Sequence, residues 1–173
     1  MKTETQGSED LSRLCKMIEN ISVAMLTNLD DAGNLVSRPM SPLEMDGAGA
    51  LWFFTDNRST KIEHLRIVNL SFADSAAGTY VSMSGHAEID MDRARMERLW
   101  TSFARPWFPD GPDSVNLALL KFVPGTAEYW DAPHSKMVRM IAMATSVVAG
   151  KPVGLGKHDT LTGLSKSPRD IVT

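Results

Sequence analysis

One segment of the chain places hydroxyl and cationic residues directly after an apolar strand. The predicted strand Leu51–Thr55 runs through a polar turn into Ser59, Thr60 and Lys61, which mark the start of a helix. The free N–H groups and the positive dipole end of a helix N-terminus favour a dianionic phosphate. The two hydroxyls can donate hydrogen bonds, and Lys61 adds a charge that Arg58 can reinforce. The segment predicts a phosphate site, although an ordinary serine cap followed by a solvated lysine has the same residues.

A second cation, Arg38, lies in the strand before this segment. It is followed by Pro39 and Pro42, which cannot donate hydrogen bonds to a sheet ladder, so the strand must lie at an edge or carry a bulge. Such a backbone leaves carbonyl and N–H groups free to meet the polar edge of a planar ligand. A mid-strand arginine is by itself common on an exposed face. Together, however, Arg38 and Lys61 could converge on one phosphate.

Motifs for other kinds of site are missing from the sequence. There is no G-x-G-x-x-G after a strand, no P-loop and no G-x-S-x-G nucleophile turn, which makes a dinucleotide fold, a Walker-type NTPase and an α/β-hydrolase poor candidates. The histidines are scattered, and none pairs with a cysteine or glutamate at a metal-ligand spacing. We therefore predict no metal site and assign no catalytic residue. These histidines are His64, His86, His134 and His158.

The composition is that of a globular protein in a reducing compartment. The chain has 173 residues, 43% of them hydrophobic, and a net charge of −3, which gives no support for nucleic-acid binding. Its single cysteine, Cys15, cannot form a disulfide within the chain. Residues 1–10 lack the apolar core of a signal peptide, and no apolar run reaches the roughly 18 residues needed to span a membrane. We expect a cytoplasmic protein with no nucleic-acid or membrane partner.

The elements that must position these residues are short strands with helices between them. Alternation of apolar and polar residues is clearest over Tyr80–Ile89, and a turn near residues 30–34 predicts a hairpin. The other predicted strands are Val23–Thr27, Leu35–Leu43, Leu70–Ala73, Leu117–Val123 and Thr126–Trp130, the last two joined by a Pro124–Gly125 turn. Six or seven short strands with inserted helices predict an antiparallel barrel in an α+β domain.

Four helices are predicted from apolar spacing and caps. In the first, Leu11, Leu14, Cys15 and Ile18 form one stripe behind a Ser8 cap, and Cys15 reads as a small buried residue rather than a reactive thiol. The others are Ser59–Arg66, a helix capped by Asp90 with the stripe Met96, Leu99, Trp100 and Phe103, and Ser135–Ala149. We divide the chain into a flexible N-terminus (1–7), one folded domain (8–149) and a C-terminal tail (150–173).

At these residues the sequence resembles the pyridoxamine 5′-phosphate oxidase-like FMN-binding split barrels, and within them the general stress protein 26 family. The resemblance covers about residues 11–149. Each motif is weak alone, but their order and spacing are specific. The motifs are Ser37–Met40, Phe53–Asp56 followed by Ser59–Lys61, Val81–Ala87, Trp107–Gly111 and Ala127–Asp131. The resemblance implies a mainly β, α+β fold, a six-stranded antiparallel split β-barrel with flanking helices, in a homodimer that binds FMN at the subunit interface.

The resemblance also implies roles for individual residues. Arg38, Thr60 and Lys61 would hold the FMN phosphate with support from Ser59, while Pro39, Met40 and Ser41 would line the edge of the flavin ring with backbone groups. Phe54 and Thr55 would contact the ring or the ribityl chain, and Tyr80 and Ser82 lie in a strand that helps to close the site. Trp130 would come from the other subunit, and Trp107 likewise from its loop. The alternative for either tryptophan is packing in the dimer core.

One departure from the family pattern bears on activity. True pyridoxamine 5′-phosphate oxidases carry an Arg-x-His motif after the strand-end tryptophan, whereas the residues after Trp130 contain no such motif. This counts against vitamin B6 oxidation. We expect a flavin-dependent oxidoreductase of unknown substrate and electron donor. The alternatives are a flavin-sequestering stress protein without turnover, or a split barrel that uses F420 or haem.

Overall fold

The structure is a computed structural model that describes residues 1–58, 64–131, 146 and 157–164. The predicted helix Ser135–Ala149, except for residue 146, and residues 59–63 of the predicted helix Ser59–Arg66 lie outside the described residues. The same is true of Ser59, Thr60 and Lys61. Within the described ranges, no helix is long and apolar enough to cross a membrane, and no three His, Cys, Asp or Glu side chains are grouped as metal ligands would be.

The described strands form one mixed sheet. Its order is β1-β4-β5-β8-β7-β6-β2-β3, with β9 paired to β8. β1 and β4 run parallel, and the other pairs are antiparallel. The strands are β1 (Lys2–Thr3), β2 (Ala24–Leu29), β3 (Leu35–Met40), β4 (Glu44–Met45), β5 (Leu51–Asp56), β6 (Val68–Asp74), β7 (Thr79–Asp90), β8 (Leu117–Asp131) and β9 (Lys157–Thr162). In the described part of the chain, the α-helices with known bounds are α1 (Glu9–Ile18) and α2 (Arg93–Leu99).

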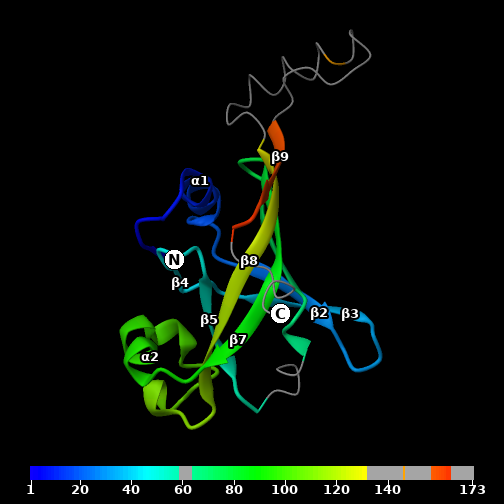
Figure 1. Cartoon of the computed structure of the whole chain (residues 1–173). Helices are drawn as coiled ribbons and strands as arrows, with labels where there is room; N and C mark the ends of the chain where they lie inside the picture. Colours follow the sequence, from blue (N-terminus) through cyan, green and yellow to red (C-terminus); the bar gives the residue numbers. More distant parts are fainter. Residues whose placement is uncertain (59–63, 132–145, 147–156, 165–173) are drawn as a thin grey trace, which may run out of the picture.

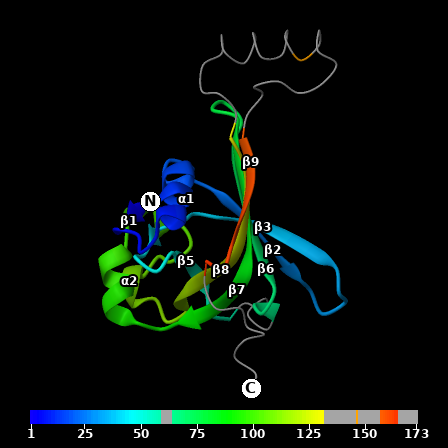
Figure 2. The same ribbon diagram turned by 45° about the horizontal axis from the view of Figure 1, so that its top comes forward.

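The mainly β class with flanking helices is confirmed, but the strand count and the purely antiparallel arrangement are not. Pro42 has no N–H to donate, so the predicted arm Leu35–Leu43 stops at Met40 and pairing resumes in β4. β1 and β9 add strands in segments that we expected to be a flexible end and a tail. Both views place α1 and α2 on one side of the long strands β7 and β8, and the β2–β3 hairpin on the other (Figures 1 and 2).

The β2–β3 hairpin has the predicted geometry. The carboxylate of Asp30 accepts hydrogen bonds from the backbone N–H groups of Ala32 (2.9 Å) and Asn34 (2.8 Å), which fixes the turn. Gly33 has a φ of 83°, a conformation that favours glycine. β3 pairs only with β2 in the described sheet, so Pro39 lies in an edge strand, as its missing N–H requires.

The predicted Pro124–Gly125 turn is wrong, because β8 runs unbroken through these residues. The register of β8 against β7 shifts between Ser84 and Gly85, which face Thr126 and Pro124. One extra residue on β8 is thus absorbed as a bulge rather than as a chain reversal. A Cβ atom at Gly85 would collide with the carbonyl oxygen of Val123, so this close approach requires glycine.

Helix α1 is confirmed and α2 is shifted. Ser8 caps α1 by accepting from the N–H of Leu11 (3.2 Å), and Cys15 is buried, which raises the pKa of its thiol and keeps it protonated. The cap of α2 is Asp92 rather than Asp90, because Asp90 still pairs with Leu119 in the sheet.

Phe103 does not extend the apolar stripe of α2. The helix ends at Leu99, and Phe103 lies in a separate short 3-10 helix, Ser102–Ala104. Its side chain is 87% exposed. The break follows from the extended backbone of Trp100 and Thr101, which turns the chain away from the helix axis. The segment after α2 is therefore free to form part of a pocket rim.

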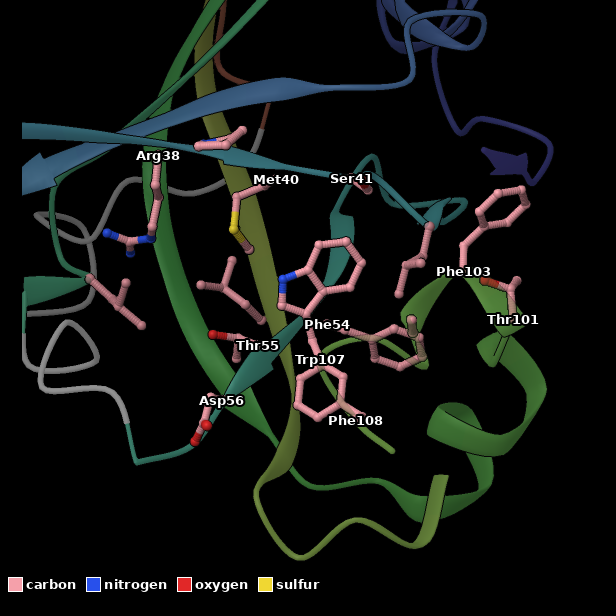
Figure 3. Close-up of a pocket in the computed structure, with 15 residues that line it drawn as sticks. Arg38, Met40, Ser41, Phe54, Thr55, Asp56, Thr101, Phe103, Trp107 and Phe108 are labelled. Atoms are coloured by element: carbon pink, nitrogen blue, oxygen red, sulfur yellow. The ribbon is translucent and has the colours of Figure 1, made fainter. Parts of the chain in front are cut away.

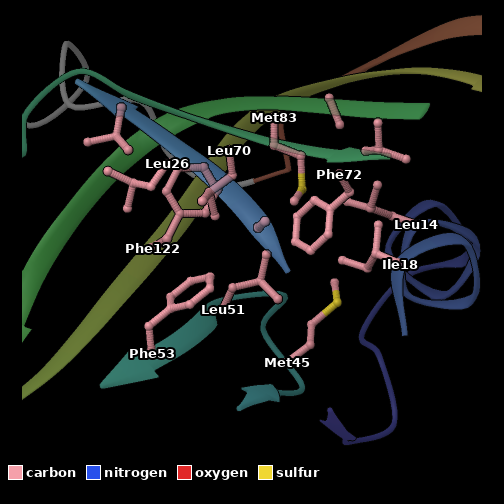
Figure 4. Packing of buried hydrophobic residues seen from close by; sticks show 14 of the residues in the cluster. Leu14, Ile18, Leu26, Met45, Leu51, Phe53, Leu70, Phe72, Met83 and Phe122 are labelled. Atoms are coloured by element: carbon pink, nitrogen blue, oxygen red, sulfur yellow. The ribbon is translucent and has the colours of Figure 1, made fainter. Parts of the chain in front are cut away.

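Two apolar clusters hold these elements together. In the larger, Leu14 and Ile18 of α1 pack toward Phe72, with Met45 and Leu51 nearby (Figure 4). The smaller cluster fastens α2 and the segment after it to the sheet through Trp52, Met96, Leu99, Phe108, Leu117 and Leu119. Burial of large apolar side chains is the main favourable term in folding. The smaller cluster therefore holds α2 and the segment after it against β5 and β8.

Candidate functional site

A pocket of about 590 Å³ opens between β3, the end of β5 and the segment that follows α2 (Figure 3). This volume lies in the usual range for cofactor and small-molecule sites. Seven predicted site residues line it: Arg38, Pro39, Met40, Ser41, Phe54, Thr55 and Trp107. The other lining residues include Leu43, Asp56, Leu65, Thr101, Phe103, Ala104, Phe108 and Leu120.

The strand register turns Arg38 inward. Arg38 stands opposite Leu26 and Met40 opposite Ala24, and both partners on β2 are fully buried. Directly opposed residues share a face of the sheet, so Arg38 and Met40 project to the inner side. This excludes the simpler interpretation of Arg38 as a solvated residue on an exposed face.

Arg38 is held by a residue that the sequence analysis missed. Its Nη1 donates to Oδ1 of Asn28 at 2.8 Å, and Nδ2 of Asn28 donates to the backbone carbonyl of Leu29 at 2.8 Å. Asn28 is only 2% exposed. The signal was present in the alternation of β2, where Ala24, Leu26 and Asn28 face inward and Asn28 is the polar one. An amide at an inward position needs a partner, and Arg38 is that partner.

The charge of Arg38 is not neutralised by the described part of the chain. No carboxylate among those residues lies within ion-pair distance of its guanidinium. Burial lowers the pKa of Arg38, which still stays protonated at any physiological pH. A half-buried, hydrogen-bonded cation that faces a pocket is suited to bind an anion.

The opposite wall is the end of β5. Phe54 packs against Trp100 and Phe108, with ring centroids 5.6 and 6.4 Å apart, so its ring is fixed. Beyond it, the Asp56 carboxylate accepts from Arg58 Nη2 and from Asn116 Nδ2, both at 2.8 Å. Hydrogen bonds from Arg58 hold the pKa of Asp56 well below its usual range. Arg58, which we expected to reinforce a phosphate site, is thus engaged by Asp56.

The mouth of the pocket carries two exposed aromatic side chains. Phe103 is 87% exposed and Trp107 is 73% exposed, although both line the pocket. Figure 3 shows the Trp107 indole between Met40 and Phe54 of the same chain. Trp107 therefore lines a pocket of its own chain, whereas we expected it to reach the site from the other subunit.

Three predicted residues lie outside this pocket. Tyr80 and Trp130 stand opposite each other on β7 and β8 and are 43% and 41% exposed. Ser82, two residues further along β7, accepts a hydrogen bond from Nδ2 of Asn69 at 2.9 Å. Of the described residues on either side of positions 59–63, Asp56 and Leu65 both line the pocket.

This architecture and the family comparison define the class of protein. The large mixed sheet with its flanking helices has the fold of a solved general stress protein 26 structure over most of the chain. The chain belongs to the family described as "Pyridoxamine 5'-phosphate oxidase like", whose model matches residues 9–153.

Similar proteins come from bacteria and a fungus. A general stress protein 26 homologue from Jannaschia sp. CCS1 has 24% identity and a TM-score of 0.72, covering 90% of this chain and 99% of its own. The general stress FMN/FAD binding protein of Xanthomonas citri has 29% identity and a TM-score of 0.62, covering 74% of this chain and 93% of its own. Protein bli-3 of Neurospora crassa is 26% identical over 170 residues, which are 91% of this chain and 81% of that protein.

Proposed function

We propose that the protein binds FMN in the pocket between β3 and β5 and works as a flavin-dependent oxidoreductase. The observation that carries this proposal is Arg38, an inward-facing, half-buried cation for which the described residues supply no anion. FMN offers the dianionic phosphate that such a group binds well, attached to a planar ring. The Xanthomonas citri relative, named as an FMN/FAD binding protein, supports this choice of ligand.

The phosphate would be shared by two parts of the chain. Arg38 would bind it from β3, and Ser59, Thr60 and Lys61 would bind it from the segment after β5. These three residues follow Asp56 by only three to five positions, within reach of the pocket wall that Asp56 lines. A guanidinium and an ammonium on one phosphate would supply strong, charge-assisted hydrogen bonds.

The flavin ring would lie on the apolar part of the pocket. Pro39, Met40 and Ser41 belong to or follow an edge strand, whose free backbone groups suit the polar edge of the ring. Phe54 and Thr55 would contact the ring or the ribityl chain from β5. When bound, FMN supplies hydride and electron transfer, while these residues bind and orient it and keep water from one face. Tyr80 and His86 do not line the pocket, and we assign no proton donor.

We further propose a homodimer in the cytoplasm in which Tyr80, Ser82 and Trp130 complete the partner's pocket. Tyr80 and Trp130 are large aromatic residues left over 40% exposed on a strand face away from their own pocket. Such residues are typical of interface anchors. The buried, free thiol of Cys15 is compatible with a reducing compartment.

A spectrum of the purified protein, followed by FMN titration and by anaerobic addition of NADH or NADPH, tests the function. A flavin spectrum that bleaches with a nicotinamide supports the oxidoreductase. Bound flavin that no donor reduces would favour sequestration without turnover. A haem or F420 spectrum would replace FMN. Among the described histidines, His64, His86 and His158, none lines the pocket to serve as a haem ligand. A colourless protein with no affinity for FMN would refute the proposal.

Replacing Asn28 tests whether Arg38 must be held in place. Asn28→Leu keeps the branched shape and the number of heavy atoms but removes the Oδ1 acceptor and the Nδ2 donor, so Arg38 loses its anchor. We expect FMN to bind more weakly by about 0.5–1.5 kcal/mol, the usual net worth of one hydrogen bond. Fluorescence titration with FMN measures this change. Asn34→Leu, in the exposed turn between β2 and β3, is the control, and an equal loss there would contradict the role of Asn28.

Mixed dimers test the shared pocket. Arg38→Ala damages the pocket itself, and Trp130→Ala damages the contribution to the partner's pocket. When the two variants are combined in one dimer, one pocket carries neither change and the other carries both. We therefore expect one tight FMN site per mixed dimer, measured by titration of dimers isolated with two affinity tags. Two weakened sites would mean that Trp130 acts on its own subunit. The Trp130→Ala homodimer is the control, because two FMN sites as tight as those of the wild type would mean that Trp130 contributes to neither pocket.

A further inference from the structure

An exposed aromatic row crosses three strands at one end of the sheet. Tyr80 of β7 stands opposite Trp130 of β8, and Trp130 stands opposite His158 of β9. Directly opposed residues share a face, so the three rings project to the same side. The rings of Trp130 and His158 are stacked, with centroids 4.9 Å apart and planes inclined by 23°. This geometry lies in the range of favourable aromatic pairs.

The position of His158 is fixed by the core. Leu161, three residues further along β9, stands opposite Ala127 and is only 7% exposed within the larger apolar cluster. Because side chains alternate along a strand, Leu161 points inward and His158 outward. The N–H of Leu164 also donates to the carbonyl of Gly125 at 3.2 Å. Both views show β9 running alongside β8 (Figures 1 and 2).

β9 lies beyond the part of the chain that the family model matches, which ends at residue 153. The strand therefore adds to the shared domain a side chain that touches Trp130, the residue proposed to reach the partner's flavin. An exposed indole on a strand can turn about two side-chain bonds, and ordering it on binding costs free energy. A ring stacked against one of its faces removes part of that freedom in advance.

We propose that His158 is a positioning residue of the flavin pocket, which holds the Trp130 indole in the orientation in which it meets the flavin of the partner subunit. This inference rests on the proposed function. It requires a flat ring at position 158, because the contact is face to face. It does not require a proton on the imidazole. The residues beside His158 on the same face are Glu128 and Thr160, which stand opposite each other, so they offer no second ring.

The test compares His158→Ala, His158→Phe and the control Thr160→Ala, an exposed neighbour on the same face of β9. For His158→Ala we expect the FMN dissociation constant to rise about three- to tenfold and the visible circular dichroism of bound flavin to change. His158→Phe should restore both, and Thr160→Ala should change neither. Thermal unfolding of the flavin-free variants measures their stability separately. If the stack were purely structural, His158→Ala would change the unfolding temperature and leave FMN binding and dichroism unchanged.

The outcomes are separable. Wild-type protein that binds no flavin would refute the proposed function itself. Wild-type protein that binds FMN, with an unchanged dissociation constant and dichroism in His158→Ala, would overturn only the role of His158. Equal losses in the Ala and Phe variants would overturn the stacking mechanism. An equal loss in Thr160→Ala would show that β9 matters but His158 does not, which also overturns the proposal.

Discussion

Replacing Arg38 by alanine should weaken FMN binding by about 1.5–3 kcal/mol, roughly ten- to a hundredfold in the dissociation constant. The guanidinium faces the pocket, is anchored by Asn28 and has no carboxylate partner among the described residues, so its loss removes a charge-assisted contact outright. Arg93→Ala is the control, because that arginine is exposed on α2 and pairs with Asp113 away from the pocket. Fluorescence titration gives both constants.

Riboflavin sharpens this experiment, because it lacks the phosphate and keeps the ring. Arg38→Ala should leave riboflavin affinity nearly unchanged while FMN affinity falls. If both ligands lose affinity equally, Arg38 supports the pocket rather than binding a phosphate, and the central observation behind the proposed function fails.

Lys61→Ala, alone and combined with Arg38→Ala, tests whether the two cations meet. Two side chains that bind the same phosphate should show coupling, so that the double variant loses less or more than the sum of the single losses. Additive losses within about 0.5 kcal/mol would indicate independent sites. Such a result would contradict the convergence of β3 and the segment after β5 on one anion.

Replacing Glu44 by glutamine should lower the free energy of unfolding by about 2–3 kcal/mol. The carboxylate is 1% exposed and accepts from Arg95 Nη1 at 3.1 Å and from Arg98 Nη2 at 2.9 Å. The Arg95 guanidinium also lies 3.9 Å from the ring centroid of Trp52. Both arginines are partly exposed and can turn to water, so the loss should stay below that of a fully buried pair.

Urea unfolding measures this change, and Glu88→Gln is the matched control. Glu88 pairs with Lys121 on the surface, where an ion pair contributes about 0–1 kcal/mol. A similar effect in both variants would contradict a special role for Glu44. Since α2 leads into the rim residues Thr101–Phe108, we also expect Glu44→Gln to loosen the pocket and weaken FMN binding slightly.

Most of the separate elements could be predicted because their signals are local. The apolar stripe of α1 with Ser8 before it, the alternation in β7 and the proline of β3 each reflect a few neighbouring residues and the geometry of one helix or strand. The boundaries were less predictable. By local pattern, Asp90 predicts a helix cap and Pro124–Gly125 predicts a turn. In the structure both segments belong to the long pairing of β7 with β8, which a local pattern does not contain.

The sequence by itself determined which residues could bind a phosphate and a ring. The charge of a cation, the hydroxyl of a serine or threonine and the missing N–H of a proline belong to the residue, whatever the fold. Only the tertiary structure decided that Arg38 faces inward onto Asn28, that Trp107 lies in the pocket of its own chain, and that β9 brings His158 onto Trp130. The physical reason is sequence separation. Strand pairing joins segments many residues apart, and the register of that pairing, which no short window contains, determines the face that each side chain occupies.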